Sequence, residues 1–198
     1  MNSKQMTVRG KLTLTFGALA ALVLGVAGFS VNALSASEAR FASFVTGINQ
    51  RALEAAKVRT AVDRRAIAAR DIVFAVQPGD IAAIQAQAVQ ADANVQRSLS
   101  NLKRLVASGS DVSSAAQVVV EKIEKIEALY RPVALRIVEL ASQGDRENAG
   151  TMINDKCRPL LAALISAADE YQVQTEIRAA EMIAQAQADF VLQRNALL

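Results

Sequence analysis

Apolar residues recur at alternating spacings of three and four positions through most of the chain after residue 35. This spacing puts them on one face of an α-helix, as in helices that pack into bundles. The pattern stops at three turn signals, at 77–80, 108–111 and 142–145, where Asp80 can cap the helix that follows and Gly144 suits the end of the helix that precedes it. Four helices are therefore expected, at about 36–77, 80–107, 112–142 and 146–198.

Each expected helix carries a continuous apolar seam. In the first helix the seam includes Ala55 and Ala69, and it contains one charged residue, Arg59. In the third helix the seam includes Tyr130. Four such seams joined by short connections predict an all-α protein, an up-down-up-down antiparallel four-helix bundle that spans residues 36–198.

A long uncharged segment precedes the bundle, with 26 residues between Lys11 and Glu38 that carry no charge. A bilayer core needs about 20 such residues, so a transmembrane helix is expected at 12–34. The basic tail before it, 1–11, should stay in the cytoplasm. This orientation places the protein in the inner (cytoplasmic) membrane, with the residues after about 35 in the periplasm.

A cleaved signal peptide is the alternative interpretation of this segment. The apolar stretch exceeds the usual apolar region of a signal peptide, which has about 7–15 residues. Ala33-Leu34-Ser35 is only a passable cleavage site, so a retained anchor is favoured. Gly17, Ala21 and Gly25 recur at every fourth position, which suits close pairing with a second transmembrane helix.

The composition argues against catalysis and against a metal site. The chain has no histidine and one cysteine, Cys157, so it lacks the residues for an intrachain disulfide or a Cys/His metal or haem site. The sequence has neither a glycine-rich phosphate loop nor a nucleophile elbow. The formal charge is only +3, and the basic residues are dispersed along the helices. We therefore expect no enzyme, no cofactor and no nucleic-acid partner.

A basic tail, an apolar span, a long first helix and three turns follow one another in an order that resembles a known family. It is the four-helix-bundle sensory module of bacterial chemoreceptors, the methyl-accepting chemotaxis proteins. Val58-Arg59 and Asp63-Arg64 resemble the arginine spacing of the aspartate-sensing subclass. The resemblance implies a homodimer that senses a ligand outside and signals inward for chemotaxis by a piston-like displacement of the fourth helix. Phe190-Val191-Leu192, near the end of that helix, resembles the approach to a second span beyond this chain.

Arginines from three helices are expected at one level of the bundle. Counted from the membrane-distal turns at about 1.5 Å per residue, Arg64 and Arg65 lie roughly 18–20 Å down and Arg158 roughly 17 Å down. Tyr130 and Arg131 reach the same level from the third helix. Together with the arginine in the first seam, the expected ligand-binding residues are Arg59, Arg64, Arg65, Tyr130, Arg131 and Arg158.

These side chains predict the binding of a small organic anion, because guanidinium groups bind carboxylates in bidentate pairs. Several arginines together favour a di- or tricarboxylate, whereas Asp155 would suit the amino group of an amino acid. Pro132 and Pro159 should loosen their helices and open a groove at this level. The third arginine of the aspartate-sensing pattern is Ala68 here, so a site held mainly within one subunit is favoured over one across the dimer.

Two other functions remain open at this point. The same sensory module on a histidine kinase or a cyclase would differ only in its cytoplasmic part. A membrane-tethered structural bundle without a small ligand is the third function. Arg59 in the apolar seam and the matched levels of the arginines argue against that structural role.

Overall fold

The computed structural model describes residues 8–109 and 111–197, and the regular structure that it describes is helical. The chain divides into two compact units, one up to Phe44 and one from Val45 onward, and each is described by itself. In chain order the elements are α1 (Val8–Ser43), a π-helical turn (Phe44–Asn49), α2 (Gln50–Phe74), α3 (Pro78–Ser108), α4 (Ser114–Ser142), α5 (Arg146–Met152), a second π-helical turn (Ile153–Cys157) and α6 (Arg158–Leu197).

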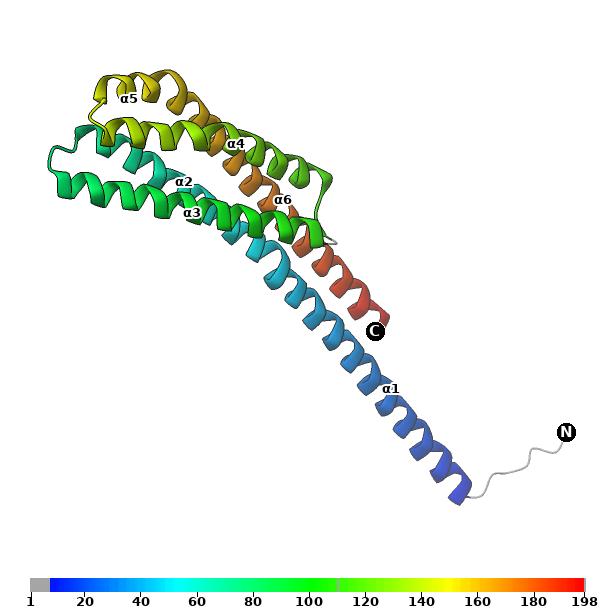
Figure 1. Cartoon of the computed structure of the whole chain (residues 1–198). Helices are drawn as coiled ribbons and strands as arrows, with labels where there is room; N and C mark the ends of the chain where they lie inside the picture. Colours follow the sequence, from blue (N-terminus) through cyan, green and yellow to red (C-terminus); the bar gives the residue numbers. More distant parts are fainter. Residues whose placement is uncertain (1–7, 110, 198) are drawn as a thin grey trace. The chain divides into compact units, whose positions relative to one another are not determined.

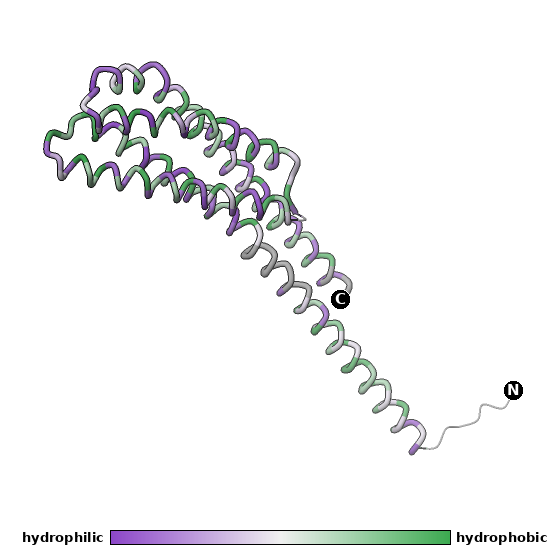
Figure 2. The backbone as a smooth tube through the Cα atoms, in the orientation of Figure 1, coloured by the Kyte–Doolittle hydropathy of each residue, from purple (hydrophilic) through white to green (hydrophobic). Residues whose placement is uncertain are grey.

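The first unit is dominated by α1, whose apolar side chains, such as Leu14, Phe16 and Leu24, are exposed. Its segment Val8–Ser35 has 28 residues and a mean hydropathy of 2.1. By length and composition it fits a transmembrane helix. Figure 2 shows mainly apolar colouring along the N-terminal part of α1, while polar and apolar residues alternate in the other helices.

The second unit is an antiparallel four-helix bundle, which confirms the all-α prediction (Figure 1). Its first three helices are α2, α3 and α4, and α5, the second π-helical turn and α6 together make the fourth. The main packing partners are α2 with α3 and α4 with α6. Within this unit α6 extends beyond the level of the α3–α4 loop (Figure 1).

Local sequence chemistry sets the helix ends. Pro78 begins α3, where its missing N–H costs nothing and its fixed φ suits a first turn. The Ser113 hydroxyl accepts a hydrogen bond from the backbone N–H of Ala116 at 3.1 Å and caps α4. Gly144 ends α4 with a φ of +88°, a conformation that favours glycine. Short connections of this kind force neighbouring helices to run antiparallel.

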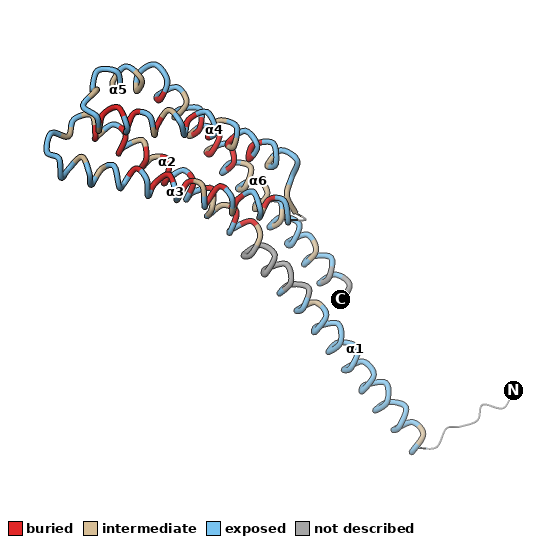
Figure 3. Tube along the Cα trace, viewed as in Figure 1, coloured by how far each residue is buried: buried red, intermediate tan, exposed pale blue. Residues whose placement is uncertain are grey.

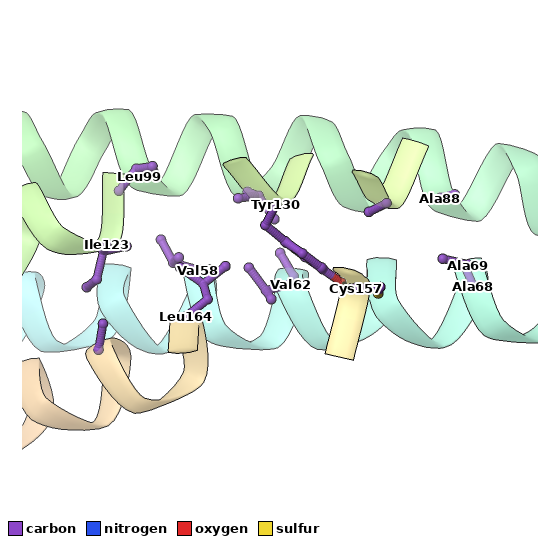
Figure 4. Close-up of a cluster of buried hydrophobic side chains, with 14 of the residues drawn as sticks. Val58, Val62, Ala68, Ala69, Ala88, Leu99, Ile123, Tyr130, Cys157 and Leu164 are labelled. Carbon is purple, nitrogen blue, oxygen red and sulfur yellow. Dashed lines mark hydrogen bonds between the residues drawn. The ribbon is translucent and has the colours of Figure 1, made fainter. Parts of the chain in front are cut away.

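The core lies where the four helices face one another (Figure 3). Figure 4 shows Val58 and Val62 of α2, Ile123 of α4 and Leu164 of α6 among its packed side chains. Alanines, including Ala69, fill the positions where α2 and α3 pack most closely. Small side chains there allow a close approach of the two helices, and a larger one would meet packed neighbours.

The buried face of α2 differs from the predicted seam by one residue at alternate positions. Ala55, Val62 and Ala69 are buried as expected, but Arg59 is 43% exposed and pairs with Asp169 of α6. The buried face also includes residues one position before the predicted Ala52, Arg59, Ala66 and Val73, namely Arg51, Val58, Arg65 and Ile72. The prediction for Arg59 was wrong because both neighbouring faces have the same spacing. Burial of the arginine-bearing face requires acidic partners from other helices.

Arg51, a second arginine on the buried face of α2, binds the α3–α4 loop. Arg51 Nη2 lies 2.6 Å from a carboxylate oxygen of Asp111. Arg178 of α6 donates from Nε to the backbone carbonyl of the same aspartate at 3.2 Å. A Cβ on Gly109 would lie 2.7 Å from Arg51 Nη1, so a larger residue there would require the arginine side chain to shift. This clasp, formed by Arg51, Asp111 and Arg178, joins α2, the loop and α6.

We predict that Ala69→Leu destabilises the bundle by about 1–3 kcal/mol, because Ala69 is fully buried and extra volume forces the close-packed helices apart. Ala56→Leu on the exposed face of α2 is the matched control and should change stability by less than about 0.5 kcal/mol. Thermal unfolding of the full chain in nanodiscs measures both variants. Equal melting temperatures for the two would contradict the assigned buried face.

Candidate functional site

A buried arginine, Arg65 of α2, lies at the centre of the bundle with an exposed fraction of 0%. Its Nη1 and Nη2 donate to the two carboxylate oxygens of Glu127 on α4, at 2.8 and 2.6 Å. Nη1 also donates to Asp92 of α3 at 2.7 Å. The guanidinium therefore makes a bidentate pair with one acid and a single contact with another, from two other helices.

A second arginine, Arg131 of α4, shares the same aspartate. Its Nε donates to both carboxylate oxygens of Asp92, at 3.0 and 3.1 Å, and its Nη2 donates to one of them at 2.9 Å. Burial by itself would raise the pKa of the Asp92 carboxyl, but the hydrogen bonds from Arg131 and Arg65 hold that pKa below its ordinary value. Asp92 is therefore an anion that two guanidinium groups hold in place.

These four side chains form a network that is defined here as Arg65, Asp92, Glu127 and Arg131. Two positive and two negative charges sum to zero, as a buried charge cluster requires. The amide nitrogen of Gln96 donates to Glu127 at 3.0 Å and supports the cluster from α3. The buried Nε of Arg65 has no hydrogen-bond partner in the described structure.

Tyr130 packs against this network from α4. The Arg65 guanidinium carbon lies 4.9 Å from the centre of the Tyr130 ring, which is a favourable cation–π distance. The Cys157 thiol of the fourth helix donates to the Tyr130 hydroxyl at 3.8 Å, and Figure 4 shows Tyr130 pointing toward Cys157. Burial raises the pKa of both side chains, so both are neutral at ordinary pH. Contacts of the network therefore reach all four bundle helices.

A surface groove of about 640 Å³ runs between α3 and α4 beside the network. The groove is within the size range of small-molecule sites. Eight residues line it: Gln96, Leu99, Glu124, Glu127, Ala128, Arg131, Pro132 and Leu135. Arg131 has a side chain that is 46% exposed, so of the two network arginines it is the one that meets solvent in this groove.

The structure brings together only some of the predicted ligand-binding residues. Arg65 contacts the ring of Tyr130, and Arg65 and Arg131 both donate hydrogen bonds to Asp92. Arg64 is exposed on α2, and Arg158 is exposed on α6, where it donates to Asn154 of the preceding turn at 3.5 Å. The buried arginine of α2 is Arg65 rather than Arg59, and acidic residues of α3 and α4 neutralise it.

Sequence reasoning missed Asp92, Glu127 and Gln96. The signal was present, because Asp92 directly follows Ala91 and Glu127 directly follows Ile126, two residues of the predicted seams. A helix buries a band wider than a single seam, so an acid next to a seam residue also faces the interior. In the part of the chain that the structure describes, no group of three or more His, Cys, Asp or Glu residues is placed to hold a metal ion.

Comparison with protein families decides the identity of this bundle. The family model described as a four helix bundle sensory module for signal transduction matches residues 5–190, nearly the whole chain. The chain belongs to this family. The sensory module therefore includes the apolar N-terminal segment and all four bundle helices. Comparisons with curated proteins and with solved structures give no significant match.

We predict that Arg65→Met lowers the free energy of unfolding of the sensory module by about 3–5 kcal/mol, because it leaves Glu127 buried without a counter-charge. Adding Glu127→Gln to this variant should restore part of the loss. Thermal and chemical unfolding of the full chain in nanodiscs measures the series.

Arg70→Met is the control for this series, because Arg70 forms an exposed pair with Asp71. It should change the free energy of unfolding by no more than about 0.5 kcal/mol. A loss for Arg65→Met as small as that of the control would contradict burial of the guanidinium.

Proposed function

We propose that this sensory module is the extracytoplasmic ligand-binding part of a transmembrane chemoreceptor and that it detects a small organic carboxylate. The observation that carries the proposal is the guanidinium of Arg131, which lines the α3–α4 groove while Asp92 holds it in position. A positioned guanidinium in a groove is a typical recognition group for carboxylates.

The orientation in the membrane follows from charge. Lys4, Arg9 and Lys11 precede the apolar segment, whereas Glu38 is the first charge after it. Basic residues beside a span remain in the cytoplasm, so the bundle lies in the periplasm and α1 anchors it in the inner membrane. A ligand in the groove is then a signal from outside the cell.

The contacts of the network supply a route from the groove to the fourth helix. Arg131 shares Asp92 with Arg65, and Arg65 contacts the ring of Tyr130. The Tyr130 hydroxyl in turn accepts the hydrogen bond from Cys157. A carboxylate that binds Arg131 changes the balance of this charge cluster, and the change reaches the helix that returns toward the membrane.

A second copy of the chain completes the proposed receptor. Leu53, Ile67 and Phe74 are exposed on α2 at multiples of seven positions, a spacing that suits pairing of two helices. We expect a homodimer that associates more strongly when ligand is bound. Sedimentation of the full chain in detergent at rising concentration, with and without ligand, measures this. Ile67→Glu should weaken association, and a strict monomer at every concentration would refute the dimer.

A membrane-tethered structural bundle is the second candidate function, because both arginines of the network already have acidic partners within the chain. Ligand binding distinguishes the two functions.

The nature of the cytoplasmic part, which would separate a chemotaxis receptor from a histidine kinase or a cyclase, is tested by sequencing the gene beyond this chain.

We predict that at least one organic carboxylate raises the melting temperature of the full chain in nanodiscs. At a hundred times its dissociation constant a ligand stabilises the fold by about 2.7 kcal/mol, which gives a clear shift. The screen covers monocarboxylates, di- and tricarboxylates and amino acids, with the matching amides as uncharged controls. If no member shifts the melting temperature at millimolar concentration, direct carboxylate sensing is wrong and the structural role is the better account.

A further inference from the structure

The α3–α4 groove has a polar part and an apolar part. Its polar part contains Gln96, Glu124, Glu127 and Arg131. Its apolar part is formed by the side chains of Leu99, Ala128, Pro132 and Leu135. We infer that the groove takes a monocarboxylate with an apolar body, of the kind exemplified by benzoate. This inference rests on the proposed function and narrows its ligand class.

The hydrogen bonds of Arg131 leave one edge of its guanidinium available. Asp92 occupies the side edge, which consists of Nε and Nη2. Nη1 makes no hydrogen bond to any described residue, and Nη2 has a second N–H that points along the other edge. A ligand carboxylate can therefore bind end-on to Nη1 and Nη2 without displacing Asp92. The aspartate also fixes the guanidinium, which lowers the entropy lost on binding.

The charges around the groove admit one carboxylate and oppose a second. Arg131 is the single cation among the eight lining residues, all of which the structure describes. The nearby charges are already paired, since Glu124 bonds Lys103 of α3 and Glu127 bonds Arg65. A second or third ligand carboxylate would meet the two glutamates rather than another guanidinium. The lining offers no second cation to offset the desolvation of a further carboxylate, so the di- or tricarboxylate favoured by the sequence fits this groove poorly.

The apolar part supplies the rest of the affinity. Leu135 is half-buried in the groove lining and offers apolar surface without a large rearrangement, whereas Leu99 is buried and exposes little. Pro132 presents a ring one position after Arg131 on α4. Binding is favoured in proportion to the apolar area removed from water, so a ligand with a flat apolar body gains more than a small polar one.

Titration calorimetry of the full chain in nanodiscs tests this inference with four named probes: benzoate, benzamide, succinate and citrate. Benzoate should bind most tightly. Benzamide keeps the apolar body without the charge and should bind at least about tenfold more weakly. Succinate and citrate should also bind at least about tenfold more weakly than benzoate, because they add charge and lack the apolar body.

Two variants of the groove locate the binding site. Ala128→Glu adds a carboxylate to the exposed groove wall without touching the network, so the fold should persist while benzoate affinity falls at least about tenfold. Arg131→Lys keeps the charge but loses the planar fork, and should also weaken benzoate binding. Arg136→Gln is the control. Arg136 lies on α4 outside the groove lining and pairs with Glu139, so its loss should leave benzoate affinity unchanged.

The outcomes separate this inference from the proposed function. Succinate or citrate binding more tightly than benzoate would overturn the monocarboxylate assignment and leave carboxylate sensing intact. Benzoate binding to Ala128→Glu with wild-type affinity would place the site elsewhere and overturn the groove. Absence of binding by benzoate, succinate, citrate and the wider carboxylate set would overturn both proposals. Benzoate binding that is lost in Ala128→Glu and kept in Arg136→Gln supports both.

Discussion

The rest of this bundle depends on one guanidinium that has no access to water. Arg65 is stable in the interior only because Glu127 and Asp92 surround it with two carboxylates, and these come from two other helices. Leaving either side of such a cluster unpaired costs far more than misplacing an apolar side chain. The cluster therefore specifies how α2, α3 and α4 align along their axes, which an alanine-rich core specifies only weakly.

The pairing of arginines with acids inside the bundle also limits which arginines could bind a ligand. An arginine that is fully paired inside the protein contributes little to anion binding, so a count of arginines at one level overstates the positive charge of the site. What remains is Arg131, half-exposed and fixed by Asp92. In the proposed site, one positioned guanidinium beside apolar side chains would select a ligand on shape as much as on charge, unlike a cluster of free arginines.

Two polar clusters that include arginines of α2 link the helices at two different levels of the bundle. The network around Arg65 links the middle of α2 to α3 and α4 and, through Tyr130 and Cys157, reaches the fourth helix. The clasp of Arg51, Asp111 and Arg178 links α2 to α6 at the α3–α4 loop. Between them the buried side chains are mainly apolar, and the exposed pair of Arg59 with Asp169 adds a further link between α2 and α6.

The sequence by itself determined the approximate extents of the bundle helices and the apolar N-terminal segment, because these follow from local chemistry: spacing, proline, glycine and caps. It did not predict the π-helical turns at Phe44–Asn49 and Ile153–Cys157. It also pointed to Arg65, Tyr130 and Arg131 as neighbours, since helical rise converts residue number into height. Only the tertiary structure decided which face of α2 is buried. Two overlapping faces share the same spacing, and arginines of both find acids on other helices. Arg65 is paired inside the bundle, by Asp92 and Glu127, whereas Arg59 is paired at the surface, by Asp169, and the positions of these acids on α3, α4 and α6 cannot be read from α2 alone.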